Sequence, residues 1–108
     1  MTRKRPGRLK GKWRIIEMPT WPADHLDIAG PAYIELDGKG RGELAFGALT
    51  ATLDCATTPS GVDFDWHGFD EGDEVTGEGW LEVQSDGSLI GEFAYDNGDE
   101  SILKALPW

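Results

Sequence analysis

The feature that most constrains the fold is a two-residue alternation of apolar and polar side chains, interrupted at short intervals by glycine-containing turns. The alternation begins at Ala32 and continues to Leu106. A period of two residues indicates strands that bury one of their two faces. The turns between them are short, as at 37–40 and 96–99, so successive strands must pair antiparallel. With an earlier strand over Leu9–Met18, eight strands are predicted.

A flat sheet of eight strands would leave two unpaired edges, and closure into a barrel removes both. Eight strands enclose an interior that side chains fill or that holds one small ligand. Glycines inside strands, at positions 77, 79 and 91, suit the sharp bends of such a sheet. The side chains predicted to point inward are Ala32, Ile34, Leu36, Leu44, Phe46, Leu49, Ala51, Leu53, Cys55, Val62, Phe64, Trp66, Val75, Leu81, Val83, Leu89, Phe93 and Tyr95.

One short helix is predicted over residues 23–30, after the first strand. Its inward-facing residues would be Leu26, Ala29 and Gly30, with Gly30 as a C-terminal stop. A helix of about two turns is not stable alone, so we expect it to lie as a lid over one end of the sheet. The predicted fold is therefore all-β: an antiparallel up-and-down barrel of about eight strands with one short helix.

Charged residues are distributed unevenly along the 108-residue chain, which has the length of one domain. Residues 1–14 hold seven basic and no acidic side chains, whereas the remainder holds three basic and all twenty acidic ones, a charge of −17. Residues 1–8 are predicted to be a disordered basic arm and residues 9–108 a single barrel domain. The arm is a frayed tail, a segment that binds nucleic acid or another anion, or a segment docked on its own acidic body. The body itself repels nucleic acid.

The chain has one cysteine, Cys55, and therefore no internal disulfide. No apolar run reaches the length of a signal peptide or the roughly 18 residues of a membrane span. Together these features predict a cytoplasmic protein without a membrane anchor. Because Cys55 alternates with Ala51 and Leu53, we expect a small core residue rather than a nucleophile.

The first strand contains Gly11-Lys12-Trp13, which resembles the G-x-W signature of calycin-type barrels: the lipocalins, the fatty-acid-binding proteins and the avidins. The resemblance implies a barrel with a helical segment after the first strand, and it implies that Lys104 packs over Trp13. The stretch from Trp13 to Ile34 also resembles small bacterial proteins of unassigned function. In physical terms, Gly11 lets the strand bend, and Trp13 caps that end of the barrel with an indole N–H that needs one partner.

Aromatic and acidic residues of the later strands supply the candidate ligand site. Trp66 points inward by alternation and would either line a cavity or fill it. Trp80 shares a face with three carboxylates, so we expect that face to be the outside; burying a carboxylate costs several kcal/mol unless it is paired. If the face were inside, Trp80 and Glu78 would form a polar anchor in an aromatic pocket. The predicted ligand-binding residues are Trp13, Phe64, Trp66, Glu78, Trp80 and Tyr95.

No pattern identifies a metal, a cofactor or a catalytic group. The stretch 63–68 resembles a calcium loop only distantly, because alternation makes the segment a strand and leaves the twelfth-position ligand missing; calcium at the acidic turns, on Asp70, Glu71 and Asp73 or on Asp96 and Asp99, is a minor alternative. No nucleophile elbow or phosphate-binding glycine loop is present, and catalysis through His67 is the weakest functional hypothesis. Two histidine–aspartate groups lack the spacing of a zinc site: His67 with Asp63 and Asp65, and His25 with Asp24 and Asp27.

Two functional hypotheses remain. The first is a small-ligand-binding barrel whose compact, partly apolar ligand lies between Phe64, Trp66 and Tyr95, beneath the helix. The second is an acidic protein–protein interaction module, of an inhibitor or immunity type, that binds a basic partner protein. The expected partners are thus a small molecule or a basic protein, without a membrane, and with nucleic acid only through the basic arm.

Overall fold

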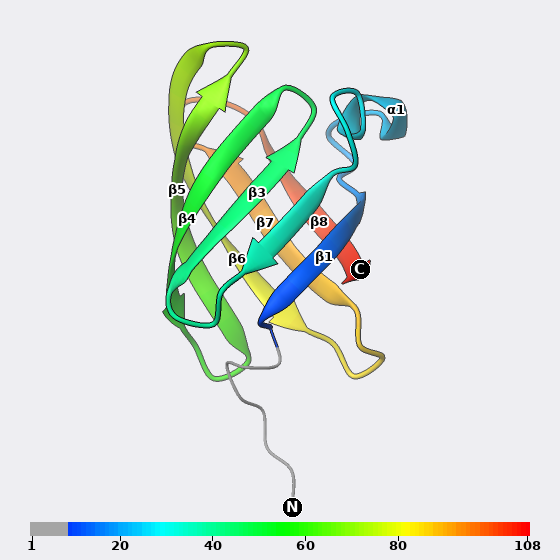
Figure 1. The fold of residues 1–108 in the computed structure, drawn as a ribbon, viewed down its shortest axis with the longest axis vertical. Coiled ribbons are helices and arrows are strands. Elements are labelled where there is room, and N and C mark those ends of the chain that lie inside the picture. Colours follow the sequence, from blue (N-terminus) through cyan, green and yellow to red (C-terminus); the bar gives the residue numbers. More distant parts are fainter. Residues whose placement is uncertain (1–8) are drawn as a thin grey trace, which may run out of the picture.

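The computed structural model describes residues 9–108, and the predicted disorder of residues 1–8 lies outside the described residues. The strands form a closed antiparallel barrel in which each pairs with its neighbours in the chain and the last pairs with the first (Figure 1), which confirms the predicted fold. The elements are β1 (Gly11–Glu17), α1 (Ala23–Leu26), β2 (Tyr33–Leu36), β3 (Arg41–Phe46), β4 (Leu49–Thr57), β5 (Gly61–Asp70), β6 (Asp73–Val83), β7 (Leu89–Tyr95) and β8 (Glu100–Pro107).

The inward side chains of the alternation form one continuous core. Every strand side chain listed above as pointing inward is buried, apart from Cys55, Val75 and Tyr95, which are partly buried and pack against the core. Each large apolar side chain buried in this way stabilises the fold by about 1.5–3 kcal/mol. The two-residue period therefore identified the inner face correctly along β2 to β7.

The glycines within β6 leave room for aromatic rings. A Cβ at Gly77 would stand 2.5 Å from Nε1 of Trp66, and one at Gly79 would stand 2.5 Å from Cζ of Phe64. Both rings come from β5 and lie directly on the β6 backbone, where any larger residue would displace them. These two glycines thus serve close packing as well as the bending of the sheet. Gly11, with φ of +120°, needs glycine for its conformation.

One end of the barrel is closed around Trp13. Its indole N–H donates a hydrogen bond to the backbone carbonyl of Leu9 at 3.0 Å, which supplies the partner that a buried tryptophan needs. Leu9 is buried as well. The turns that follow β4 and β6 lie at this same end (Figure 1). The point at which the described chain begins is therefore fixed to the barrel.

At the other end, α1 is shorter than predicted. It spans Ala23–Leu26 rather than residues 23–30, and Ala29 and Gly30 are exposed rather than inward-facing. Leu26 is the buried side chain of α1, and its carbonyl accepts a hydrogen bond from the Gly47 N–H, at the β3–β4 turn, at 2.9 Å. The part of the predicted lid that closes this end is thus a single turn of helix.

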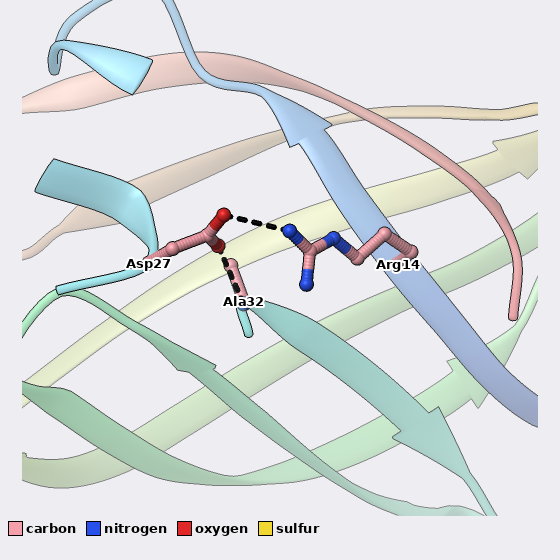
Figure 2. Close-up of polar contacts among 3 residues, drawn as sticks. All are labelled: Arg14, Asp27 and Ala32. Carbon is pink, nitrogen blue, oxygen red and sulfur yellow. Dashed lines mark hydrogen bonds and ion pairs between the residues drawn. The ribbon is translucent and has the colours of Figure 1, made fainter. Parts of the chain in front are cut away.

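The side chain of Asp27 explains why the helix stops. One carboxylate oxygen pairs with Arg14 of β1 at 2.6 Å, and the other accepts the backbone N–H of Ala32 at 2.9 Å (Figure 2). Both bonds draw the chain back to the barrel wall. An aspartate that bonds to nearby backbone in this way competes with helix continuation. The sequence pattern alone did not reveal the contact with Arg14, thirteen residues away.

Candidate functional site

The six residues predicted to bind a ligand lie on opposite sides of the barrel wall. The inner group fills the core, and the outer group lies on a solvent-facing surface. Phe64 of the inner group borders the same groove as Glu78 and Trp80, whereas Trp13, Trp66 and Tyr95 do not line it. The inner group is Trp13, Phe64, Trp66 and Tyr95, and the outer group is Glu78 and Trp80.

The Trp66 side chain fills the barrel interior at its own height along the barrel axis. Its ring is stacked on Phe93 with centroids 4.7 Å apart, and the ring of Tyr95 meets it edge-on at 5.1 Å. The indole N–H donates to the backbone carbonyl of Ala94 at 3.1 Å. Such offset and edge-to-face contacts add about 0.5–1.5 kcal/mol each to the burial of the rings. Of the two roles predicted for Trp66, the structure supports that of a core residue here.

Trp80 lies on the outer face of β6, as expected from its acidic neighbours. It is partly exposed, and its indole N–H donates to a carboxylate oxygen of Glu92, on β7, at 2.9 Å. Glu78, two residues earlier on the same face, is exposed. The ring is therefore held against the wall by a side chain from the next strand while part of its surface meets solvent.

Carboxylates lie directly opposite one another around Trp80. Asp54 on β4 is the register partner of Asp65 on β5, which in turn is the partner of Glu78 on β6. In the next row, Trp80 stands between Asp63 on β5 and Glu92 on β7. Side chains directly opposite have Cβ atoms about 4.5–5.5 Å apart, and like charges in that position destabilise a sheet.

These side chains line an open groove of about 930 Å³ on the outer face of β4 to β8. Apolar contributions come from Trp80 and Ile102, and the described lining includes no lysine or arginine. Among residues 9–108, one of the groove carboxylates forms an ion pair: Asp54 with Arg41, at 2.9 Å. We call this surface the acidic groove; its charged residues are Asp54, Asp63, Asp65, Glu78, Glu92 and Glu100.

Cys55 borders the acidic groove but is a poor nucleophile. Burial, with a further contribution from Asp37 and Asp54, raises the pKa of its thiol to about 11. The thiol is therefore protonated at neutral pH, and the reactive thiolate is scarce. This agrees with the predicted role as a small residue packed against the core.

A second opening, of about 510 Å³, lies between the β5–β6 and β7–β8 turns. Trp21, Val75 and Tyr95 contribute its apolar lining. The Tyr95 hydroxyl donates to Asp70 at 2.8 Å, and burial together with this acidic neighbour raises the pKa of the phenol. The opening is the closest counterpart in the structure to the predicted small-ligand site.

The histidine–aspartate groups do not assemble into a metal centre. Within residues 9–108, no three side chains of the metal-binding types are grouped to hold an ion. His67 is exposed on the outer face, where its register partners are Thr52 and Thr76. The carboxylate of Asp27 is already bonded to Arg14 and to the backbone.

Sequence reasoning missed most of the acidic groove. Alternation places its carboxylates on the outside, but only the strand register shows that they face one another. Hairpin lengths could have suggested this register, because short turns fix the pairing of the strands that they join. The groove residues absent from the predicted site are Asp54, Asp63, Asp65, Glu92 and Glu100.

Two features that the calycin resemblance implied can be located in the structure, and neither tests the resemblance itself. A short helix follows β1, but Lys104 is exposed on the outer face, whereas Trp13 is buried inside opposite Pro107. The structure thus does not bring Lys104 and Trp13 together. Among residues 9–108, no helix is long and apolar enough to cross a membrane. No protein-family model matches the chain, and no curated protein or solved structure gives a significant match.

Proposed function

We propose that this protein is an interaction module whose acidic groove binds a basic segment of a partner protein, as an inhibitor or immunity-type factor would. The supporting observation is the set of directly opposed carboxylates in a groove whose described lining includes no basic residue. The proposal includes the cytoplasmic location predicted from the single cysteine.

The opposed carboxylates do not serve the stability of the barrel. Asp65 has Asp54 on one side and Glu78 on the other, and each like-charged neighbour opposes strand pairing. A cationic partner would relieve this repulsion, so part of the unfavourable energy of the free protein would become favourable binding energy. The arrangement therefore supports binding of a cation-rich surface.

Trp80 adds an anchor to the charge. A lysine or arginine over the face of a tryptophan gains about 0.5–2 kcal/mol, and tryptophan is enriched among residues that dominate protein interfaces. The bond to Glu92 holds the ring in place before binding. A preorganised ring loses less conformational entropy on binding than a freely rotating side chain.

The charge of the whole body favours the same class of partner. Residues 9–108 carry six basic and twenty acidic side chains, a formal charge of −14. A body with this charge attracts basic proteins over about the 8–10 Å Debye length of physiological solutions and speeds their association.

The test compares two double variants that remove the same charge. Asp65→Asn/Glu78→Gln neutralises an opposed pair inside the groove, whereas Glu35→Gln/Glu43→Gln neutralises an opposed pair on β2 and β3, away from it. The probe is a labelled octalysine peptide, and the partner is sought by affinity capture with the same proteins at low and high salt.

We expect the groove variant to bind octalysine at least tenfold more weakly at 50 mM salt and to lose the captured partner, while the matched control changes less than twofold. High salt should weaken both interactions of the wild-type protein. Equal losses in the two variants would show that only the overall charge matters, and they would refute the proposed site.

A second candidate function, small-ligand binding, is favoured by the opening beside Tyr95. Its volume of about 510 Å³ is within the 300–1,000 Å³ of small-molecule sites, and two aromatic rings line it. A thermal-shift screen against metabolites tests this function: a ligand at a hundredfold excess over its Kd stabilises by about 2.7 kcal/mol. Trp21→Ala should remove the shift; a shift that persists in this variant places the ligand elsewhere.

A further inference from the structure

We infer that the opening between the β5–β6 and β7–β8 turns binds a small organic cation, whose ammonium group lies against the rings of Trp21 and Tyr95. The inference rests on the second candidate function, small-ligand binding, and names the chemical class of the ligand. It does not depend on the acidic groove. Three observations support it: the two rings that line the opening, the contacts that hold these rings, and the charge of the remaining lining.

Trp21 and Tyr95 form an aromatic corner in the opening. Their ring centroids are 6.3 Å apart and the ring planes are inclined at 59°, so the rings are not stacked on one another. Both side chains are partly buried, and both line the opening of about 510 Å³. An aromatic face attracts a cation that lies within about 6 Å of its centroid, and tryptophan is the most favourable ring. Two inclined rings in one opening can therefore contact the same ammonium group.

The aromatic corner is held in place by the core before any ligand binds. Trp21 packs on Phe46 with centroids 4.9 Å apart, and Tyr95 meets Trp66 edge-on at 5.1 Å. Phe46 and Trp66 are buried. The backbone N–H of Trp21 donates to the carbonyl of Met18 at 2.9 Å, which fixes the chain that carries the ring. Because both rings are already ordered, binding costs little conformational entropy at these side chains.

The hydroxyl group of Tyr95 makes its ring a better contact for a cation. It donates a hydrogen bond to the carboxylate of Asp70 at 2.8 Å, and donation to a negative group polarises the phenol toward higher electron density in the ring. Burial, together with the carboxylates of Asp70 and Asp99, raises the pKa of the phenol. The hydroxyl therefore remains a donor at neutral pH, and the hydrogen bond persists under the conditions of binding.

The remaining lining favours a positive ligand over a negative one. Glu74 and Asp99 are exposed carboxylates of the lining, and no lysine or arginine of residues 9–108 borders the opening. Because these carboxylates are exposed, they add a screened attraction, and the rings supply the direct contact. Val75 adds an apolar surface for the carbon atoms of the ligand. The lining thus fits an ammonium group that carries a short organic chain.

The test compares two probes of nearly the same shape: choline, and 3,3-dimethylbutan-1-ol, in which a carbon atom replaces the charged nitrogen. Binding to the full chain is followed by backbone amide and indole N–H chemical shifts. A cation on one exposed ring gains about two- to fivefold in affinity, so two rings predict a preference for choline of about five- to thirtyfold. The shift changes should concentrate on Trp21, Tyr95 and Gly98, which line the opening.

Two variants of Trp21 separate the attraction of a ring for a cation from ordinary apolar contact. Trp21→Leu keeps an apolar side chain without a ring and should reduce the preference for choline to about two- to fivefold, the share of Tyr95. Trp21→Phe keeps an aromatic face and should preserve a preference of at least about fivefold. Each preference is a ratio of two affinities measured on one variant, so a general loss of stability does not change it. Equal preferences in Trp21→Leu and the wild type would contradict the proposed contact.

A matched pair of double variants tests for an effect of overall charge. Glu74→Gln/Asp99→Asn removes two carboxylates from the lining, whereas Glu35→Gln/Glu43→Gln removes two from β2 and β3. We expect the first to weaken choline binding about threefold and the second to change it by less than about 1.5-fold, because exposed charges act over a short screened range. Equal losses would show that choline responds only to the net charge of the protein, and they would overturn the inference.

The inference and the small-ligand function can fail separately. Equal affinities of choline and 3,3-dimethylbutan-1-ol at the opening would overturn the ligand class and leave the small-ligand function intact. If neither probe at millimolar concentration shifts the residues of the opening, the inference is wrong, while the metabolite screen still decides the small-ligand function. Choline shifts confined to other surfaces would overturn the inference as well.

Discussion

Trp66 and Trp80 lie on neighbouring strands and face opposite sides of the same barrel wall. Inside, Trp66 is 2% exposed, stacked on Phe93 and bonded to a backbone carbonyl. Outside, Trp80 is partly exposed and bonded to the side chain of Glu92. The inner ring is held by a core side chain and by a backbone carbonyl, which are parts of the barrel itself. The outer ring is held by the Glu92 side chain, which the barrel does not need in order to form.

The inner face therefore contributes to the stability of the fold, whereas the outer face is the surface proposed to bind a partner. On the inner face, apolar contacts fill the space, and in the described chain no buried side-chain polar atom lacks a partner. On the outer face, Asp54, Asp65 and Glu78 face one another at a cost to folding. The proposed function accounts for this cost in the groove, and the following four predictions test the distinction between the two faces.

The largest effect is expected inside. Trp66→Ala removes a buried ring and leaves a cavity beside Phe93, so the free energy of unfolding should fall by about 3–5 kcal/mol. Urea denaturation measures the change. Ile102→Ala, at a side chain that is 58% exposed, should alter the stability by no more than about 0.5 kcal/mol. Similar losses in the two variants would break the distinction between the faces.

At the outer tryptophan, binding should change more than stability. Trp80→Ala should weaken octalysine binding by about 1–2 kcal/mol, roughly five- to thirtyfold, and lower the free energy of unfolding by less than about 1 kcal/mol. Fluorescence anisotropy and urea denaturation provide the two values. A loss of stability comparable with that of Trp66→Ala would assign Trp80 to the core.

Removing one groove carboxylate should stabilise the protein. Asp65→Asn relieves the repulsion with Asp54 and Glu78 and should raise the free energy of unfolding by about 0.2–1 kcal/mol at low salt. The gain should shrink at 500 mM salt because the repulsion is screened. Glu35→Gln is the control: Glu35 faces Glu43 on one side but Lys12 on the other, so little gain is expected.

The smallest effect concerns Cys55. Its folded-state pKa of about 11 exceeds the ordinary thiol value of 9.0, so the native state holds the thiol proton more tightly than the unfolded state does. The stability from this residue is therefore complete below pH 9 and decreases as the pH rises from about 9 to 11. Alkylation by iodoacetamide should accelerate up to about pH 11, and Cys55→Ser should flatten the pH dependence of unfolding. An alkylation rate that levels off near pH 9 would contradict the assignment.

The fold was predictable because its determinants are local. The alternation from Ala32 onward and the short turns fix which side chains share a face and which strands pair. The end of α1 was not predictable, since it depends on a contact between Asp27 and Arg14 on another element. The residues of the groove were visible in the sequence, but their mutual approach follows only from the register of four successive strands.

The pairing of Trp13 with Pro107 and of Ile15 with Ala105 joins the first and the last strand of the barrel. The remaining pairs join strands that are neighbours in the chain, through short turns except for the connection that contains α1, and they can form as the chain emerges from the ribosome. β1 must wait for nearly the whole barrel to be synthesised before its second edge is covered. Because such distant pairings form slowly, we expect nascent chains to depend on this step to escape aggregation.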